Sequence, residues 1–201
     1  MNDRRCSSVH AMTWLQSDRL SELLRGASSV ALFGSRASNC ARAESDWDFL
    51  CIGESRSKKE RGLDLVWVNP AVVCSGMWLS TDLAGHVAAF GVWIKGEPSW
   101  KIGDVDFSAA ARRKEANIAR TVRALAPAWD LLGPAYQAKH ATLLRREVQR
   151  WALLSLGDAV APAAALDAKW ARAPLPWIVD FLVGMSVQRE LIARILVAGS
   201  I

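Results

Sequence analysis

Short apolar runs separated by polar or glycine-containing turns make up the first part of the chain. Residues 13–26 place leucine and tryptophan at helical spacing and end at a glycine, which predicts a helix with a C-terminal glycine cap. Residues 28–33, 46–52 and 63–68 are apolar runs of strand length, each bounded by turn-type or charged residues. The pattern therefore predicts one helix followed by three strands.

The segments that follow these runs carry further signals. Residues 53–62 are polar and flanked by glycines, as in a long hairpin loop. Residues 80–89 are typical of a short helix with Ser80 or Thr81 as its N-cap, and residues 90–96 are typical of a fourth strand. The front part of the chain is thus expected to combine strands with flanking helices.

The second half of the chain has a different pattern. Helix propensity and a helical period predict helices over 108–125, 136–156 and 176–198, with Pro- and Ala-rich connections between them. We therefore expect an α+β fold with two domains, in which residues 1–104 contain the strands and residues 105–201 are helical.

Composition and charge narrow the function only slightly. The chain has 201 residues, of which 51% are hydrophobic, and this is enough to bury a sizeable core. The formal net charge of +5 and the pI near 9.3 mildly favour an anionic partner such as a nucleotide, a nucleic acid or a phosphorylated substrate.

The cysteines and the apolar segments bear on the cellular location of the protein. The four cysteines show no C-x-x-C spacing, and Cys51 and Cys74 lie in apolar runs, which favours reduced thiols in a cytoplasmic protein. The first residues are charged and have no apolar segment typical of a signal peptide. Residues 176–198 are interrupted by charged residues, which favours a buried amphipathic helix over a membrane span.

Two aspartates stand one residue apart in the apolar run 46–52. Because strand side chains alternate between faces, Asp46 and Asp48 are expected on one side, with Cα atoms roughly 6.5 Å apart, and Trp47 on the other. Buried carboxylates need a partner, since their desolvation costs several kcal/mol. A divalent cation is such a partner, because Mg²⁺ is typically held by one or two carboxylates together with substrate phosphates.

Further residues with matching chemistry flank this pair. Asp64 lies in the run 63–68 and reaches the same face if the two strands are neighbours. Gly34 and Ser35 close the first strand, where a glycine permits close backbone approach to a phosphate and a serine offers a hydroxyl and an N–H. Arg36 could add a charge-assisted contact to a phosphate oxygen.

The run FGSRA, a short loop, SDWDFL and then LDLV resembles the minimal nucleotidyltransferase pattern of the DNA polymerase beta superfamily, over about residues 13–96. The resemblance implies a small mixed-sheet nucleotidyltransferase core. It implies that Asp46 and Asp48 bind metal, and that Asp64 completes the metal set and helps to activate the attacking hydroxyl. It further implies that Gly34 and Ser35 hold the triphosphate.

The resemblance also implies the reaction, which is in-line attack by an acceptor hydroxyl on the α-phosphate of a nucleoside triphosphate (NTP), ATP among them, with pyrophosphate leaving. Mg²⁺ is the expected cofactor and Mn²⁺ the alternative. The acceptor stays open between a small molecule, an RNA and a protein. A module that keeps the fold and binds nucleotide without turnover is the competing interpretation, although such a module has no need to bury three like charges.

Other polar and aromatic residues are assigned mainly structural roles. His10, His86 and His140 lack ligand spacing and are given no chemistry. Lys59 and its basic neighbours in the loop 53–62 are expected to be solvated. Most tryptophans lie among apolar neighbours and are expected in the core, and Trp100 is the one considered as a stacking surface.

The basic residues of the helical half raise the chance of a nucleic-acid acceptor, although such residues usually form solvated faces. They are Arg112, Arg113, Lys114, Arg120, Arg123, Lys139, Arg145, Arg146 and Arg150. The apolar residues of 176–198 fit either internal packing or a homodimer contact.

Overall fold

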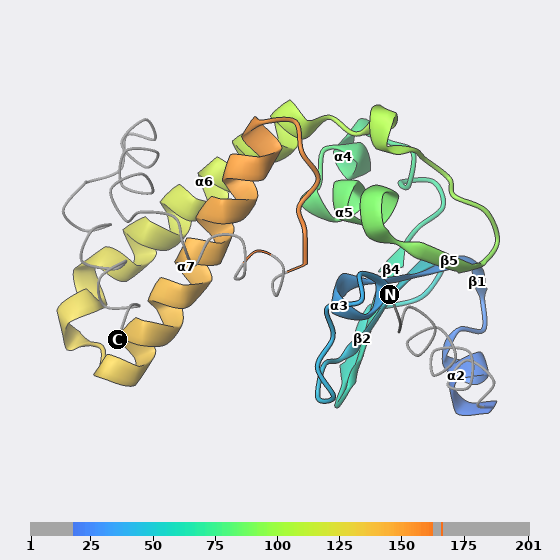
Figure 1. Cartoon of the computed structure of the whole chain (residues 1–201), viewed down its shortest axis with the longest axis horizontal. Coiled ribbons are helices and arrows are strands. Elements are labelled where there is room, and N and C mark those ends of the chain that lie inside the picture. The colour runs from blue at the N-terminus through green and yellow to red at the C-terminus, as the bar shows by residue number, and fades with distance from the viewer. Residues whose placement is uncertain (1–17, 163–165, 167–201) are drawn as a thin grey trace, which may run out of the picture. The chain divides into compact units, whose positions relative to one another are not determined.

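The computed structural model describes residues 18–162 and residue 166 of the 201-residue chain (Figure 1). The chain divides into two compact units, with the division between Asp106 and Phe107. The predicted helix over 176–198 and residues 13–17 of the first predicted helix lie outside the described residues. Within the described part, no helix is long and apolar enough to cross a membrane.

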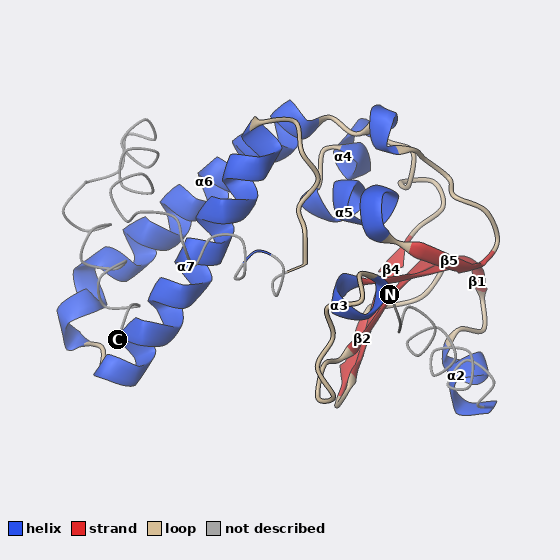
Figure 2. Cartoon of the chain, viewed as in Figure 1, coloured by secondary structure: helices blue, strands red, loops and turns tan. Residues whose placement is uncertain are grey.

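A five-stranded mixed sheet forms the centre of the first unit (Figure 2). Its strand order is β3-β4-β2-β1-β5, in which β2 and β4 are parallel and the other neighbours are antiparallel. The strands are β1 (Ala27–Phe33), β2 (Trp47–Gly53), β3 (Lys58–Glu60), β4 (Leu63–Val68) and β5 (Val92–Lys95). The α+β fold class and the four predicted strands are confirmed.

The connection between β2 and β4 corrects the sequence prediction. The polar segment 53–62, expected as a hairpin loop, contains β3, which pairs with β4 around a tight turn at Arg61 and Gly62. Gly62 has a φ of 77°, a conformation that glycine adopts without steric cost. The sequence pattern did not indicate this strand, because its exposed lysines are also typical of a loop. Edge strands commonly carry such charged side chains.

Short helices connect and cover the strands. They are α2 (Asp18–Leu23), α3 (Gly34–Ala37), α4 (Gly76–Leu79), α5 (Asp82–Phe90) and the 3₁₀ turn η1 (Ile102–Asp104). Of the two predicted N-caps of α5, Thr81 is the one used, since its hydroxyl accepts a hydrogen bond of 3.1 Å from Ala84 N. The predicted helix over 80–89 is therefore confirmed, with its first turn two residues later.

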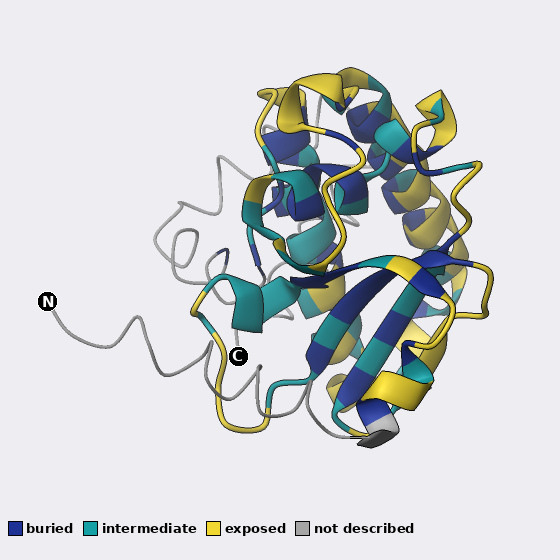
Figure 3. Cartoon of the chain, turned by 90° about the vertical axis from the view of Figure 1, so that its right-hand side faces the viewer, coloured by how far each residue is buried: buried dark blue, intermediate teal, exposed yellow. Residues whose placement is uncertain are grey.

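The two faces of β2 differ in chemistry. Trp47, Phe49 and Cys51 point into a core that also contains Leu20 of α2 and Leu65 of β4. The alternating side chains, among them that of Asp48, lie on the opposite face. Figure 3 shows the longer strands largely in the colours of buried and half-buried residues. The first face is thus apolar throughout, while the opposite face carries the Asp48 carboxylate beside the buried Leu50 and Ile52.

Trp100 belongs to the core, so its predicted stacking surface is wrong. The indole is only 4% exposed and makes edge-to-face contacts with Trp78 and Trp93, with ring centroids 5.4 and 5.7 Å apart. Its Nε1–H donates to the carbonyl oxygen of Ala84 at 3.0 Å. The charged residue beside it in the sequence suggested exposure, but a buried backbone acceptor satisfies the polar end of the ring.

The second unit contains a helical hairpin. Helices α6 (Phe107–Leu125) and α7 (Pro134–Ser155) pack side by side and are joined through the 3₁₀ segment η2 (Ala126–Leu131). Both predicted helices in this region are confirmed. Lys114 and Arg150 do not form the expected solvated face, because both bind the Glu147 carboxylate, at 2.7 and 2.6 Å.

Candidate active site

The parallel pairing of β2 and β4 brings two of the predicted acids together. Asp48 and Asp64 are direct partners in the register, flanked by the pairs Trp47–Leu63 and Phe49–Leu65. Side chains of directly paired residues lie on the same face of a sheet. The two carboxylates are therefore neighbours on the face opposite the core of Phe49 and Leu65, as the sequence predicted for paired strands.

Asp46 lies just outside the strand in which it was expected. Strand β2 begins at Trp47, whose N–H donates to the carbonyl oxygen of Gly62 at 2.9 Å. The half-buried Asp46 directly precedes this anchored residue. It is still close enough for its charge to raise the pKa of the Asp48 carboxyl. Its contribution to the site is thus electrostatic in the present arrangement.

Asp48 carries the clearest electrostatic signature in the sheet. Its pKa rises from 3.8 to about 6, first because burial disfavours the charged form and then because Asp64 and Asp46 repel it. Lys59 and Arg36 oppose this rise without cancelling it. The carboxylates thus outweigh the nearby cations around Asp48, and an added cation would be stabilised here.

Lys59 contacts the third acid. In the register of β3 and β4 it stands opposite Asp64, and its Nζ lies 3.3 Å from Asp64 Oδ2. The lysine side chain is 69% exposed, as expected for a solvated residue, so this ion pair is open to water and salt. The hydrogen bond to Asp64 raises the pKa of Lys59. Asp64 thus has a lysine partner, whereas none of the described residues forms such an ion pair with Asp48.

The backbone of Gly34 closely approaches the Asp48 carboxylate, whereas the sequence suggested an approach to a phosphate. Its φ is 73°, and a Cβ built at this position would lie 3.1 Å from Asp48 Cγ and closer still to Asp48 Oδ2. Any side chain here would displace the acid or strain the backbone. Ser35 follows at the start of α3 and is half-buried. The turn Gly34-Ser35 therefore lies directly against Asp48.

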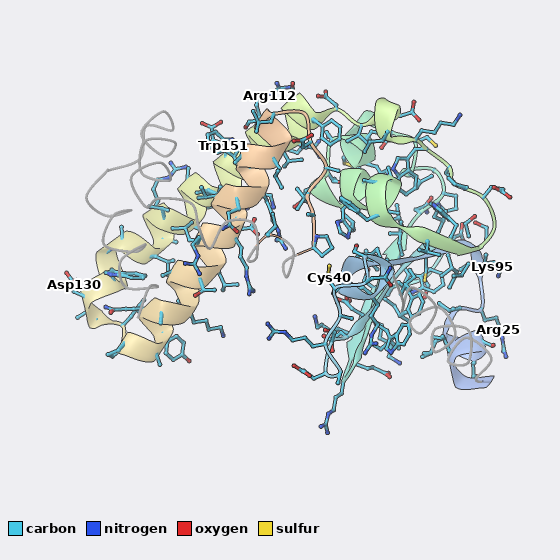
Figure 4. The ribbon with its side chains drawn as sticks, viewed as in Figure 1. Arg25, Cys40, Lys95, Arg112, Asp130 and Trp151 are labelled. Carbon is cyan, nitrogen blue, oxygen red and sulfur yellow. The ribbon has the colours of Figure 1, made fainter. Side chains whose placement is uncertain are left out.

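The loop after α3 is tied back to this turn. The N–H of Cys40, the residue labelled in Figure 4, donates to the carbonyl oxygen of Ser35 at 2.9 Å, and its thiol donates to the carbonyl oxygen of Ser38 at 3.3 Å. Cys40, Cys51 and Cys74 are all free thiols.

Arg36 is engaged with the protein itself. Its Nη2 and Nε donate to the carbonyl oxygen of Ser45, at 2.6 and 3.1 Å, and its guanidinium carbon lies 4.2 Å from the ring centroid of Trp47. These contacts hold the segment that leads into Asp46. Direct contact of Arg36 with a phosphate stays a prediction.

His86 is a site residue that the sequence analysis missed. It lies on α5 with 8% exposure, and its Nε2 accepts a hydrogen bond of 3.1 Å from Gly34 N. A signal for this role is present in the sequence, because a histidine among the apolar residues of a predicted helix must find a polar partner when buried. The sequence does not indicate which partner.

The donor set fits a magnesium ion that is bound together with a substrate. Among residues 18–162 and 166, no group of three or more His, Cys, Asp or Glu side chains is arranged to hold a metal ion by itself. Mg²⁺ does not require such a cage, because it commonly uses one or two carboxylates and completes its shell with water and phosphate oxygens. The neighbouring carboxylates and the raised pKa of Asp48 match that requirement.

Residues 16–84 match the nucleotidyltransferase domain family. This match covers only part of the chain and lies within the first unit. The matched region includes the turn Gly34-Ser35, all of β1 to β4 and the three predicted acids. The resemblance to minimal nucleotidyltransferases of the DNA polymerase beta superfamily is thus confirmed, and nucleotidyl transfer is supported in general terms. No curated protein matches the chain.

Proposed function

We propose that this protein is a Mg²⁺-dependent nucleotidyltransferase that moves a nucleoside monophosphate from an NTP to an acceptor hydroxyl and releases pyrophosphate. One observation carries the proposal. The Asp48 carboxyl has its pKa raised to about 6, lies in register with Asp64 and touches the Gly34-Ser35 turn within a nucleotidyltransferase domain. The site thus combines excess negative charge with a turn of the type that approaches phosphates.

Asp46, Asp48 and Asp64 are the residues proposed to hold the metal, which is Mg²⁺ or alternatively Mn²⁺. When bound, the ion would neutralise the carboxylates and the triphosphate and so stabilise charge that develops during transfer. The pKa shift of Asp48 supports this assignment, since burial and like charges together disfavour its ionised form without a cation.

Asp64 is proposed to accept the proton of the attacking hydroxyl. The acceptor oxygen then forms a bond to the α-phosphorus, and the bond from that phosphorus to the oxygen bridging to the β-phosphate breaks. The electron pair of the broken bond leaves with pyrophosphate. The contribution of Gly34 and Ser35 is to position the triphosphate, as expected where catalysis depends on orientation and electrostatics.

The helical unit is proposed to select the acceptor, which is a small molecule, an RNA or a protein. Some of its basic residues are paired within the unit, since Lys114 and Arg150 bind Glu147. The exposed basic residues that remain for an anionic acceptor include Arg112, Arg120, Arg123 and Lys139. An RNA acceptor would give binding that weakens steeply with salt, because counterions are released. A homodimer contact through residues 105–201 also stays a proposal.

One observation favours a second candidate, a nucleotide-binding module without turnover. The ion pair between Lys59 and Asp64 neutralises the proposed base. Because the lysine is well exposed, we expect a substrate or metal to displace Lys59 from Asp64 readily. Transfer therefore remains our first proposal.

Incubation with each α-labelled NTP, Mg²⁺ and a cell extract tests the proposal. We expect label to enter one fraction among protein, RNA and small molecules, and the Asp64→Asn variant to leave all fractions unlabelled. The exposed acid Asp130, changed to Asn, provides the control that should label normally. Label transfer by Asp64→Asn at the wild-type rate would contradict the proposed base.

A further inference from the structure

His86 holds the backbone of the Gly34-Ser35 turn from the side of α5. Its Nε2 lies 3.1 Å from Gly34 N, and its ring contacts Phe33 edge-on and Phe90 at a tilt, with centroids 6.1 and 5.4 Å away. Only 8% of the residue is exposed. The imidazole is therefore fixed by packing as well as by the hydrogen bond.

The direction of this hydrogen bond defines the state of the ring. A backbone N–H can only donate, so Nε2 must be unprotonated and the neutral ring must carry its proton on Nδ1. With Nε2 occupied by Gly34, this nitrogen is directed at the protein backbone. Through Nε2, the histidine thus acts on the backbone of the turn.

Gly34 is consequently fixed at two points. Its amide is held by His86, and its Cα faces the Asp48 carboxylate so closely that no Cβ fits. The left-handed φ of 73° places Ser35 at the start of α3, immediately after this doubly held residue. A change at His86 therefore alters both the orientation of the turn and its spacing to Asp48.

We propose that His86 is a positioning residue for the triphosphate-binding turn: it takes up the Gly34 N–H, so that Ser35 supplies the phosphate contacts of the turn. This inference rests on the proposed function and deepens it. It departs from the simplest expectation, in which both residues of the turn donate to phosphate. The ligand class is the polyphosphate chain of an NTP.

Two substitutions separate the hydrogen bond from the packing. His86→Phe keeps an aromatic ring between Phe33 and Phe90 but removes the acceptor, whereas His86→Gln places an amide oxygen near the position of Nε2. We expect His86→Phe to weaken binding of a non-hydrolysable Mg²⁺-NTP analogue by about tenfold or more. The same variant should raise KM more than it lowers kcat. His86→Gln should recover most of that loss, and His140→Phe in the helical unit serves as the control.

Calorimetric titration gives the affinities, and ¹⁵N NMR of the wild-type imidazole gives an independent result. An unprotonated Nε2 that couples to the Gly34 amide supports the assignment, and a proton on Nε2 overturns it even if a variant fails to fold. Wild-type affinity in His86→Phe, or equal losses in the Phe and Gln variants, would also overturn it. A wild-type protein that binds no NTP would instead refute the proposed function.

Discussion

Each unit contains a group of partly buried charged side chains, and the two groups differ in how their charges are balanced. In the helical hairpin, the Glu147 carboxylate lies between Lys114 and Arg150, with contacts of 2.7 and 2.6 Å. In the sheet, Asp48 is surrounded by further carboxylates, and its pKa rises to about 6. The carboxylate of the first group has two cationic partners, while in the second group the carboxylates outweigh the nearby Lys59 and Arg36.

The difference separates a structural cluster from a candidate site. A carboxylate with two cationic partners needs no further ligand, and its residues are explained by the packing of α6 on α7. A set of like charges that folding brings together costs stability unless something else is gained. We therefore propose that function resides at the sheet. Each variant below should affect one cluster and leave the other unchanged.

The largest effect is expected from Asp48→Asn. This substitution keeps the shape of the side chain and removes one proposed metal-binding charge, so transfer should fall by at least about a thousandfold. Label transfer from an α-labelled NTP measures the loss, with Asp130→Asn as the control. Transfer within a few-fold of wild type would show that the charge of Asp48 is not used in the reaction.

The matching change in the helical unit is Glu147→Gln, which removes the carboxylate charge that the buried ammonium of Lys114 contacts. We expect the free energy of unfolding to fall by about 2 to 3 kcal/mol in a denaturant titration, since removing one charge from a largely buried ion pair is destabilising. Arg112→Gln, an exposed change on α6, is the control (Figure 4). If Glu147→Gln removed NTP binding without changing stability, the proposed division of roles would be reversed.

A smaller effect is expected from pH in the metal-free protein. Because the pKa of Asp48 is about 6 when folded and near 3.8 when unfolded, the folded state binds this proton more tightly. The contribution of Asp48 therefore lowers stability as pH rises from about 4 to 6, by about 1 to 2 kcal/mol after allowance for solvent screening. Asp48→Asn should remove this component, and an identical pH profile in the variant would contradict the assigned cause.

The smallest effect is expected from Lys59→Ala. The ion pair with Asp64 is solvent-exposed on the lysine side, so unfolding free energy should change by less than about 0.5 kcal/mol. Since Lys59 lowers the pKa of Asp48, the variant should raise that pKa further, which ¹³C NMR of the carboxyl carbon can follow. An unchanged Asp48 pKa would show that Lys59 does not act on the acid cluster.

Much of the fold was predictable because its elements have strong local patterns. The apolar runs of β1, β2 and β4 and the long periodic segments of α6 and α7 match their predicted types. Strand β3 was missed because its pairing with β4, and not its three polar residues, makes it a strand. The hairpin expected between β2 and β4 was wrong as well, because these two strands pair in parallel and β3 lies between them in the chain.

The candidate site was predictable where chemistry is local and not where it depends on distant contacts. Asp46, Asp48 and Asp64 could be found because acids within apolar runs are unusual. The hydrogen bond from Gly34 to His86 joins residues 52 positions apart, and no periodicity reveals it. The engagement of Arg36 with Ser45 and Trp47 is likewise a property of the folded loop.

The central claim is that the acid cluster on the sheet is completed by a divalent cation and an NTP. Thermal unfolding of the full chain tests it most directly, with each common NTP in the presence and absence of Mg²⁺, for the wild type and Asp48→Asn. We predict that Mg²⁺ and one NTP together stabilise the wild type by about 2.7 kcal/mol at 100 times the dissociation constant, and that neither alone does so. The same addition should leave Asp48→Asn unchanged. Equal stabilisation of both proteins, or none with any NTP, would contradict the account.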